Sequence, residues 1–576
     1  MKKGQTLSIS NHANGLRINL LSSTMLARVG VLSLILAGAA TVPQAAQAAG
    51  LLVNSDTTWD QDHTINDLLV VRGGAGGATL TIKDGAAVKS TSGYIADSRN
   101  SVGAVIVSGP GSSWDIVNPD PRGARELFIG GFGNGIYGGK ATLTIENGGR
   151  VSGKDVYVGA LMEGDGKLFV RGAGSTLTAD YLGVAVGALT NNNGEVVIED
   201  GGLISSNRAD FENGKVLLSG QNSRWINTGE FMIGDSFTIE KGAVVSTGTA
   251  TLQEQESVDL ITMYVDGAGS EFKINDRLTI GEEGSVNLSV ANGAKLSAGS
   301  IVISGSGNFI QEGMGSLTIG GKVEHSRVGG VTALEAQMAG IVDPSAAITF
   351  GAGDGHLNFN HTNAGYDFAN TIGGKGTINS LAGETILSGD LTKFNGNVNV
   401  DGGKLVLKGN LDTTDNDGNV NDALRYSTTK FDVKDGTLIV DGEAGRIQTN
   451  AFGGKTYTNS VIVWGENLNR MGNQTSAAFG RLGGSGTVGD TFIDTKAVIA
   501  PGNNSTGVLT IAGELEMAGG SIYEADIAGN GSADRIDVKI VDGGVARSGT
   551  ATIRSGVDVH VTALDAATSY QNGQTY

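Results

Sequence analysis

One turn motif returns along this chain and constrains its fold more than any other feature. The motif reads Gly-x-Gly-Ser, then any residue, then a large apolar residue. Its copies begin at Gly109, Gly172, Gly220 and Gly267, at intervals of 63, 48 and 47 residues. The third copy has Asn222 in place of the second glycine of the motif. A turn and an apolar residue that return at a similar interval indicate repeated units that stack and bury that residue between them.

Short strands fill the intervals between these turns. In residues 141–152, Leu143, Ile145 and Val151 alternate with polar residues, and an Asn-Gly-Gly turn lies between the two apolar stretches. This period of two predicts strands with one buried face. The same phrase returns near residues 80–88, 196–204, 237–244 and 286–296. Two phrases of roughly 20–25 residues each make a larger repeat near 50, within the range of stacked repeat architectures.

The fold class predicted from this pattern is all-β, a right-handed parallel β-helix, or solenoid. At this repeat length the chain forms roughly 20 rungs, with neighbouring strands ~4.8 Å apart. Trp114 and Trp225 occupy the repeat position that Leu177 and Phe272 also fill. We therefore expect both tryptophans to be core residues; the alternative is a role in binding.

Composition limits the classes of partner. The chain of 576 residues has 93 glycines, 6 prolines and no cysteine, so it has many turns and no disulfide bonds. Its formal net charge is −19, which disfavours nucleic acids and anionic membrane surfaces as partners.

The N-terminus is typical of an export signal. Arg28 precedes a run of small and apolar residues from Val29 to Ala40, and Ala46-Gln47-Ala48 matches a small-x-small cleavage site. We predict a long signal peptide at residues 1–48, cleaved after Ala48, with no transmembrane helix after its removal. A buried core helix is the alternative reading. Translation starting at Met1 or at Met25 fits the sequence equally.

The mature chain divides into four predicted stretches. Residues 49–330 form a β-helix with the Gly-Ser-aromatic repeats, and residues 331–360 form an irregular interruption in which Val331–Met338 contains one or two helical turns. Residues 361–545 resume the β-helix, and residues 546–576 hold its last strands. Asp412–Asp422 is expected to be a polar loop that leaves a rung.

Several segments resemble passenger domains of bacterial autotransporters, the type V secreted proteins. Residues 385–409 are similar to the autotransporter-associated β-strand repeat, and residues 482–511, 523–527 and 532–538 resemble the segment that precedes the translocation barrel. The resemblance implies a barrel of about 250–300 residues after this segment, whereas the sequence ends at Tyr576. We therefore expect a passenger without its translocator, either a truncated gene product or a fragment.

No catalytic, cofactor-binding or metal-binding residue is predicted. Gly234-Asp235-Ser236-Phe237 resembles the start of an esterase motif, but Asp60 and His63 provide the only Asp-x-x-His, and they lie on the wrong side of it. Asp415–Gly418 resembles part of a calcium loop but lacks acids at its first and twelfth positions. His356 and His361 lack a third ligand. No cofactor is expected, and the protein is predicted not to be an enzyme.

The resemblance implies an adhesin or cell-surface interaction protein. Its expected partners are a receptor or glycan on a host or neighbouring cell and its own or a missing outer-membrane barrel. It would be exported by the Sec pathway to the cell surface or outer membrane, or stay in the periplasm if the barrel is absent. The alternatives are a non-functional truncated passenger and a passenger with esterase or glycan-directed activity.

Overall fold

The protein is described by a computed structural model, which covers residues 50–118, 123, 125–131, 138–160, 164–187, 193–254, 261–305, 313–326, 330–409, 411, 430–444, 447–449, 455–457, 460–465, 479–542, 545–571 and 573–576. The predicted signal peptide with its cleavage site at Ala48, the polar loop Asp412–Asp422 and the calcium-like Asp415–Gly418 lie outside these residues. Leu51–Tyr576 form one compact unit.

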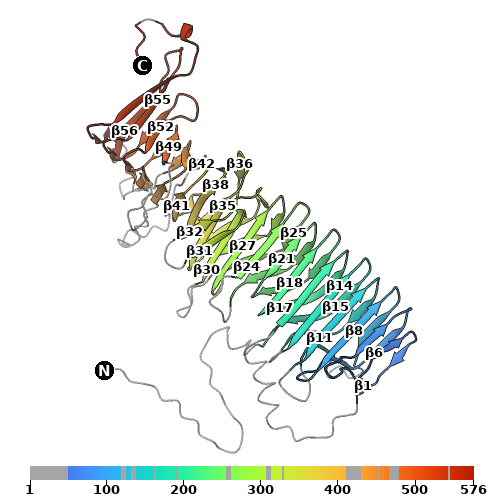
Figure 1. Ribbon diagram of the computed structural model, residues 1–576. Coiled ribbons are helices and arrows are strands. Elements are labelled where there is room, and N and C mark those ends of the chain that lie inside the picture. The colour runs from blue at the N-terminus through green and yellow to red at the C-terminus, as the bar shows by residue number, and fades with distance from the viewer. Residues whose placement is uncertain are drawn as a thin grey trace, which may run out of the picture. The chain divides into compact units, whose positions relative to one another are not determined.

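Within this unit the chain is a parallel β-helix, as the sequence predicts. Most successive strands in the chain belong to three sheets in turn, and these strands pair in parallel with strands of the neighbouring rungs (Figure 1). We expect the β-helix to be right-handed, because nearly all crossover connections between parallel strands are right-handed. In the described residues the chain contains only three antiparallel strand pairs, β31–β32, β46–β47 and β56–β57.

The first sheet contains nineteen strands in the described residues, close to the predicted number of rungs. They are β2 (Thr57–Trp59), β5 (Thr79–Ile82), β8 (Val102–Ser108), β11 (Lys140–Glu146), β14 (Asp165–Arg171), β16 (Asn193–Glu199), β18 (Gly214–Ser219), β21 (Phe237–Glu240), β24 (Ile261–Asp266), β27 (Ser285–Ala291), β30 (Met314–Gly320), β35 (Asp354–Asn360), β38 (Thr377–Ala382), β41 (Asn397–Val400), β43 (Lys430–Val433), β48 (Ser460–Val463), β51 (Thr491–Ile493), β54 (Leu515–Met517) and β58 (Ala551–Ile553).

The second sheet has two stretches. The first runs through β3 (His63–Thr64), β6 (Ala87–Ser90), β9 (Ser113–Ile116), β12 (Arg150–Ser152), β15 (Thr176–Val184), β17 (Leu203–Phe211), β19 (Arg224–Asn227), β22 (Val244–Thr247), β25 (Glu271–Ile274), β28 (Lys295–Ser297) and β33 (Ile341–Val342). The next runs through β36 (Tyr366–Phe368), β39 (Glu384–Leu387), β42 (Lys404–Leu407), β44 (Thr437–Val440), β49 (Arg481–Gly484), β52 (Val498–Pro501), β55 (Ile522–Ile527) and β59 (Asp558–Ala563).

The third sheet begins with β1 (Leu51–Val53), β4 (Leu68–Val71), β7 (Ser92–Ile95), β10 (Glu126–Ile129) and β13 (Asp155–Val158). The long strands β15 and β17 pair with each other in both the second and the third sheet. The third sheet continues through β20 (Glu230–Ile233), β23 (Thr249–Leu252), β26 (Arg277–Ile280), β29 (Ser300–Ile303), β34 (Ala347–Phe350), β37 (Ile372–Gly374) and β40 (Lys393–Phe394), and a later stretch holds β45 (Glu443–Ala444), β50 (Thr487–Val488), β53 (Val508–Ile511) and β56 (Arg535–Asp542).

The apolar residues of the repeat motif fill the interior. Trp114, Leu177, Trp225 and Phe272 are fully buried, which confirms the core role expected for the two tryptophans. Because burial separates the indole N–H from bulk solvent, each of these tryptophans needs a buried partner. Trp114 Nε1 donates to Ser90 Oγ at 3.0 Å, and Trp225 Nε1 donates to Ser206 Oγ at 2.9 Å.

The serine of each repeat motif joins its own turn to the turn of the preceding rung. Its hydroxyl oxygen accepts a hydrogen bond from a glycine backbone N–H in that turn. The pairs are Gly85 to Ser112 (3.0 Å), Gly148 to Ser175 (3.0 Å), Gly201 to Ser223 (3.1 Å) and Gly242 to Ser270 (2.9 Å). We call these four bonds the serine locks. They give a physical reason for the serine in the motif, because a turn N–H without an acceptor is costly when it is partly buried.

The predicted helical turns at Val331–Met338 are wrong. Val331–Ala333 belong to β32 (Gly330–Ala333), which pairs in antiparallel register with β31 (Val323–Ser326). Strands β33, β34 and β35 follow, one in each sheet, so the stack continues through residues 341–360. A helix of eight residues is marginal on its own, whereas a hairpin and the neighbouring rungs supply hydrogen-bond partners for this backbone.

The described residues contain one helical element, the short 3₁₀ helix η1 (Ala567–Ser569). None of the described helical structure is long and apolar enough to cross a bilayer. The remaining short strands are β46 (Ile447–Thr449), β47 (Lys455–Tyr457) and β57 (Val545–Ser548).

Candidate functional surface

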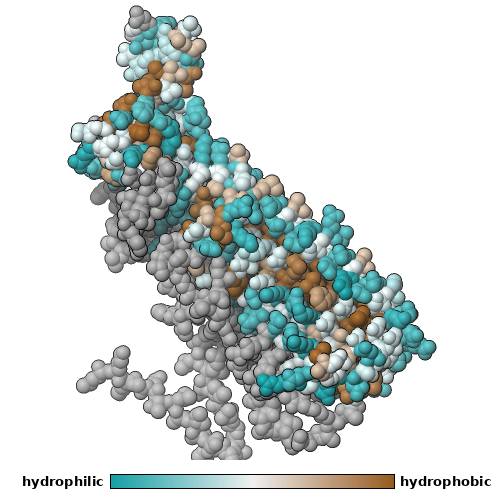
Figure 2. Space-filling model, viewed as in Figure 1, coloured by the Kyte–Doolittle hydropathy of each residue, from teal (hydrophilic) through white to brown (hydrophobic). Residues whose placement is uncertain are grey.

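The interior of the β-helix is occupied by packed side chains, so the surfaces that can meet a ligand are the outer faces of the sheets. Inward residues such as Leu143, Val170 and Leu288 are fully buried in a continuous apolar core. On the face that Figure 2 shows, hydrophilic residues are mixed with small hydrophobic patches. Among the described residues no group of three or more His, Asp or Glu side chains is arranged to hold a metal ion.

The esterase-like residues do not come together. Ser236 is exposed in the turn before β21, where its N–H donates to Asp235 Oδ1 at 2.6 Å. His63 belongs to β3, and its ring stacks on Trp59 of β2 with the centroids 4.3 Å apart. Six strands of the first sheet separate β2 from β21. A catalytic pair between Ser236 and His63 is therefore ruled out by distance.

The two histidines considered as metal ligands lie in and next to β35: His356 belongs to this strand, and His361 directly follows it. His356 Nε2 lies 3.2 Å from Asp354 Oδ1. His361 is fully buried, its Nδ1 accepts from the Asn363 N–H at 3.2 Å, and its Nε2 lies 2.8 Å from Thr385 Oγ1. Burial lowers the pKa of His361, so the ring is neutral at neutral pH and its contacts are those of a structural histidine.

An aromatic row crosses the outer face of the third sheet, which the sequence reading missed. Tyr94, Phe128 and Tyr157 occupy one register column of β7, β10 and β13. The Phe128 ring stacks on Tyr157 with centroids 4.7 Å apart and planes 8° apart, and it meets Tyr94 edge-on at 5.4 Å. Tyr181 of β15 continues the row, 5.6 Å from Tyr157. The available signal was limited to Phe128 and Tyr157, each of which lies between two aliphatic residues shortly before a glycine.

Acidic side chains accompany the aromatic row. Burial raises the pKa of Glu126, and its neighbour Asp155 raises it further. Burial also raises the pKa of Asp155 itself. Burial, with Glu126 and Asp97 nearby, raises the pKa of Tyr94 to about 12, so this phenol stays protonated in any physiological medium. Because two of its rings stack face to face, the row presents mainly ring edges rather than open faces.

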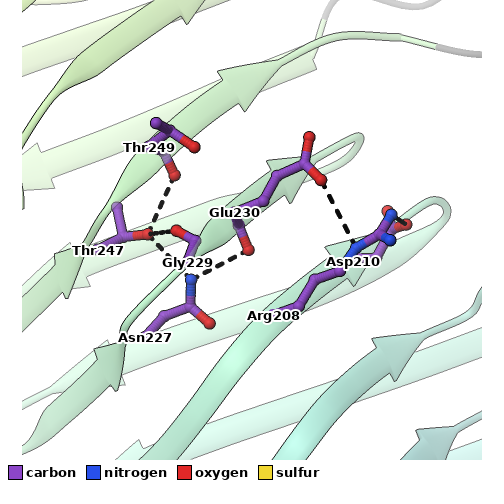
Figure 3. Close-up of polar contacts among 7 residues, drawn as sticks. All are labelled: Arg208, Asp210, Asn227, Gly229, Glu230, Thr247 and Thr249. Carbon is purple, nitrogen blue, oxygen red and sulfur yellow. Dashed lines mark hydrogen bonds and ion pairs between the residues drawn. The ribbon is translucent and has the colours of Figure 1, made fainter. Parts of the chain in front are cut away.

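A charged group ends the aromatic row at β17 and β20. The guanidinium carbon of Arg208 lies 5.7 Å from the Tyr181 ring centroid, within the range of a cation–π contact. The same guanidinium group lies 3.5 Å from Asp210 and 3.7 Å from Glu230 (Figure 3). These distances describe a partly exposed charge network, which contributes little to stability.

A buried polar corner lies beside this network, between the second and third sheets. Asn227 Nδ2 donates to the Glu230 carbonyl and to Thr247 Oγ1, both at 3.0 Å (Figure 3). Thr247 Oγ1 also contacts the carbonyls of Gly229 and Thr249 at 3.0 Å. Asn227 and Thr247 are 2% and 0% exposed, so their side chains satisfy backbone groups where the rung bends and are not available to a ligand.

A cavity of about 380 Å³ opens on the outer face of the first sheet. We call it the Tyr264 cavity. Its floor comes from two adjacent register columns of β21, β24 and β27, and its wall comes from the segment that follows β30. The lining residues are Thr238, Glu240, Tyr264, Val265, Asp266, Ser289, Ala291, Gly320, Lys322 and Gln337.

Side-chain size explains the hollow. Tyr264 pairs in register with Ser289, and Asp266 pairs with Ala291. From one rung to the next, the outward side chains therefore shrink from a large ring and a carboxylate to a hydroxymethyl and a methyl group, which leaves a hollow on the outer surface. Ser289 is 2% exposed and its Oγ has no hydrogen-bond partner, an unusual state for a buried hydroxyl.

The wall is held in place by backbone hydrogen bonds to the turn after β27. The Asn292 N–H donates to the Met338 carbonyl at 2.8 Å, and the Gly293 N–H donates to the Ala339 carbonyl at 3.1 Å. Asn292 Nδ2 donates to Asp266 Oδ1 at 2.7 Å and lies 3.4 Å from Gln337 Oε1. The wall residue Lys322 places Nζ 4.1 Å from the Tyr264 ring centroid. Nothing in the sequence pattern predicts this meeting of Lys322 and Gln337 with β24.

Known proteins show a distant similarity to parts of the chain. No protein-family model matches it. It is 25% identical over 294 residues to the uncharacterized protein YuaQ of Escherichia coli (strain K12), which covers 49% of this chain and 16% of that protein. It is 27% identical over 256 residues to the adhesin BmaC autotransporter of Brucella suis biovar 1 (strain 1330), which covers 42% of this chain and 7% of that protein. The chain thus spans a small part of both relatives, and over about two fifths of its own length it is distantly related to an autotransporter adhesin.

Proposed function

We propose that this protein is an exported, adhesin-like passenger that acts at the cell surface by binding other surfaces. The observation that carries the proposal is the 27% identity to an autotransporter adhesin over 256 residues. The parallel β-helix supports it, because a stack of rungs presents long outer faces on which similar groups recur. Weak contacts repeated along such a face add up through effective concentration.

The proposed route of export rests on the N-terminal sequence. Residues 1–48 would direct the chain into the Sec pathway, and cleavage would follow Ala48. N-terminal sequencing of the mature protein tests this directly. A mature terminus at Ala49 supports the proposal, whereas retention of residues 1–48 on the exported protein contradicts it.

An adhesion assay tests the proposed function. Beads coated with the purified protein are expected to bind a panel of host and bacterial cells more strongly than beads coated with the same protein unfolded by heat. Binding should increase steeply with coating density, because avidity depends on simultaneous contacts. Equal binding by folded and unfolded protein, or no binding across the panel, would contradict an adhesive role.

A further inference from the structure

We propose that the Tyr264 cavity binds the terminal sugar of a neutral glycan. The biological use of this site rests on the proposed adhesive function, whereas its chemistry stands on the cavity alone. The site combines a buried hydroxyl without a partner, two carboxylates, an amide, an ammonium group and an aromatic ring around one hollow. Each group has a part in recognising a polyol.

The unpartnered hydroxyl of Ser289 is the strongest sign of a ligand. A buried polar group without a hydrogen bond is costly, and most such groups in proteins have a partner. Ser289 lines the cavity and lies next to Tyr264 in register. Its Oγ is closed off from solvent in the free protein. A sugar hydroxyl would therefore supply the missing hydrogen bond only once a side chain that lines the cavity moves aside, and a serine hydroxyl can then either donate or accept.

The groups that line the cavity with Ser289 include both donors and acceptors. The carboxylates of Glu240 and Asp266 can only accept, and the ammonium group of Lys322 can only donate, while the amide of Gln337 does both. Neighbouring hydroxyls of a sugar ring likewise donate and accept. Hydrogen bonds to charged groups are stronger than neutral ones, so this set can hold a sugar against competition from water.

The aromatic ring supplies the apolar part of the site. A pyranose has C–H groups on its ring faces, and these pack against an aromatic face by burial and by attraction to the π electrons. In the free protein Lys322 Nζ covers the Tyr264 ring at 4.1 Å. The lysine stem is flexible, so an entering sugar takes the place of the ammonium group, which then moves to the sugar hydroxyls.

Charge and size restrict the ligand to neutral sugars. Among the charged groups, Lys241 is paired with Glu240 at 2.7 Å, whereas Asp266 has only an amide donor on it. Together with a net charge of −19, this disfavours uronic acids, sialic acids and sulfated sugars. A volume of about 380 Å³ lies at the small end of ligand sites. It therefore suits one or two sugar units at the end of a chain and excludes a longer folded glycan.

The test uses the full-length protein and immobilised neutral oligosaccharides that end in glucose, galactose, N-acetylglucosamine or N-acetylgalactosamine. Tyr264→Ala removes the ring, and Ser289→Ala removes the unpartnered hydroxyl. We expect the best-bound sugar to bind Ser289→Ala about 5- to 10-fold more weakly, as for the loss of one hydrogen bond. Tyr264→Ala should lose measurable binding.

Two controls separate binding from folding. Ser289 Oγ has no partner in the free protein, so Ser289→Ala should keep the wild-type melting temperature while it loses affinity. Phe169→Ala is the matched control, because Phe169 also points outward from the first sheet and lies under a cation, with Arg171 5.9 Å from its ring centroid, but it does not line the cavity. This variant should bind as wild type does.

Two outcomes overturn the proposal: no sugar of the panel binds, or sugar binding survives both substitutions. Failure of the glycan site remains distinguishable from failure of the adhesive function. If Tyr264→Ala beads still bind cells while no sugar binds, the adhesive function stands and the glycan site falls. If a sugar binds but no cell does, the glycan site stands and the adhesive function falls.

Discussion

Two regions of the same β-helix connect neighbouring rungs in different ways. From β5 to β25 the serine locks join each repeat turn to the turn below. From β30 to β41 the side-chain hydrogen bonds between rungs lie instead on the outer face of the first sheet, where asparagine amides form a ladder. Asn358 donates to Ser316 and Thr318, Asn379 donates to Asn358 at 2.7 Å, and Asn399 donates to Asn379 at 2.9 Å.

The difference shows that the backbone stack does not depend on a particular repeat. In the serine-locked region the side chain satisfies a turn N–H, whereas in the asparagine-ladder region the side chains satisfy one another. Asn358 and Asn379 are 0% and 2% exposed although both face away from the core. The ladder is therefore a buried polar network, and each of its members depends on its neighbours.

The largest expected effect belongs to an apolar residue of the serine-locked region. Trp225→Ala should lower the free energy of unfolding by about 3–5 kcal/mol, because it leaves a cavity among Phe211 and Phe231, whose ring centroids lie 5.3 and 5.1 Å away. Guanidinium unfolding followed by circular dichroism measures it. Trp464, 37% exposed in the other half of the chain, is the matched control, and an equal loss in Trp464→Ala would refute the assignment of the core.

A smaller loss is expected in the asparagine ladder. Asn379→Ala removes a hydrogen bond on each side, including the one that Asn379 donates to the buried Asn358 Oδ1. Breaking one member of a buried network should cost about 1–3 kcal/mol. The same denaturant series measures this loss, and an unchanged unfolding midpoint would mean that the ladder does not contribute to stability.

Loss of a serine lock should lower the free energy of unfolding less than loss of a residue from the asparagine ladder. Ser175→Ala leaves the Gly148 N–H without its acceptor, but this turn is partly exposed and water can replace the hydroxyl. We expect a loss of about 0.5–1.5 kcal/mol. Comparison of Ser175→Ala with Asn379→Ala sharpens the contrast between the regions, and a greater loss in the serine variant would reverse it.

The smallest effect concerns pH in the asparagine-ladder region. Burial lowers the pKa of His361, whereas the unfolded chain keeps a value near 6.5. Below about pH 6.5 the unfolded state therefore binds a proton that the folded state refuses, so stability falls as the pH falls toward the lowered pKa. The decline in melting temperature from pH 7.5 to 5.5 should be smaller in His361→Gln.

Glu126 and Asp155 act in the opposite direction, because their pKa values are raised in the folded state and their protonation at low pH favours folding. The wild-type protein and His361→Gln both have this contribution, so it cancels when their melting temperatures are compared. An identical decline in wild type and His361→Gln would show that His361 does not contribute to the pH dependence.

The sequence predicted the fold through features that repeat, and it missed features that occur once. The Gly-Ser turns and the alternating Leu, Ile and Val residues identified the parallel stack, because a period is visible without knowledge of contacts. Asn358, Asn379 and Asn399 were missed as a ladder because asparagine is depleted in strands and gives no strand signal. The β31–β32 hairpin was taken for helical turns because its strand partner is another short segment without a repeat.

The candidate site also could not be predicted from the sequence. Neither Tyr264 nor Ser289 was singled out from the sequence. Their pairing follows from the register of β24 and β27, but the position of Lys322 and Gln337 follows from an excursion that has no counterpart in the other rungs. A cavity built by an irregular segment leaves no periodic trace.

The central claim is that successive rungs stack in parallel and in register, and engineered disulfide bonds test it most directly because the chain has no cysteine. Lys167 and Glu195 are register partners in β14 and β16, at the separation that a disulfide spans. A Lys167→Cys, Glu195→Cys double variant should form an intramolecular disulfide on mild oxidation. Lys167→Cys with Val197→Cys, shifted two residues along the same face, should not. Equal bonding in both variants, or bonding in the shifted pair alone, would contradict the stack.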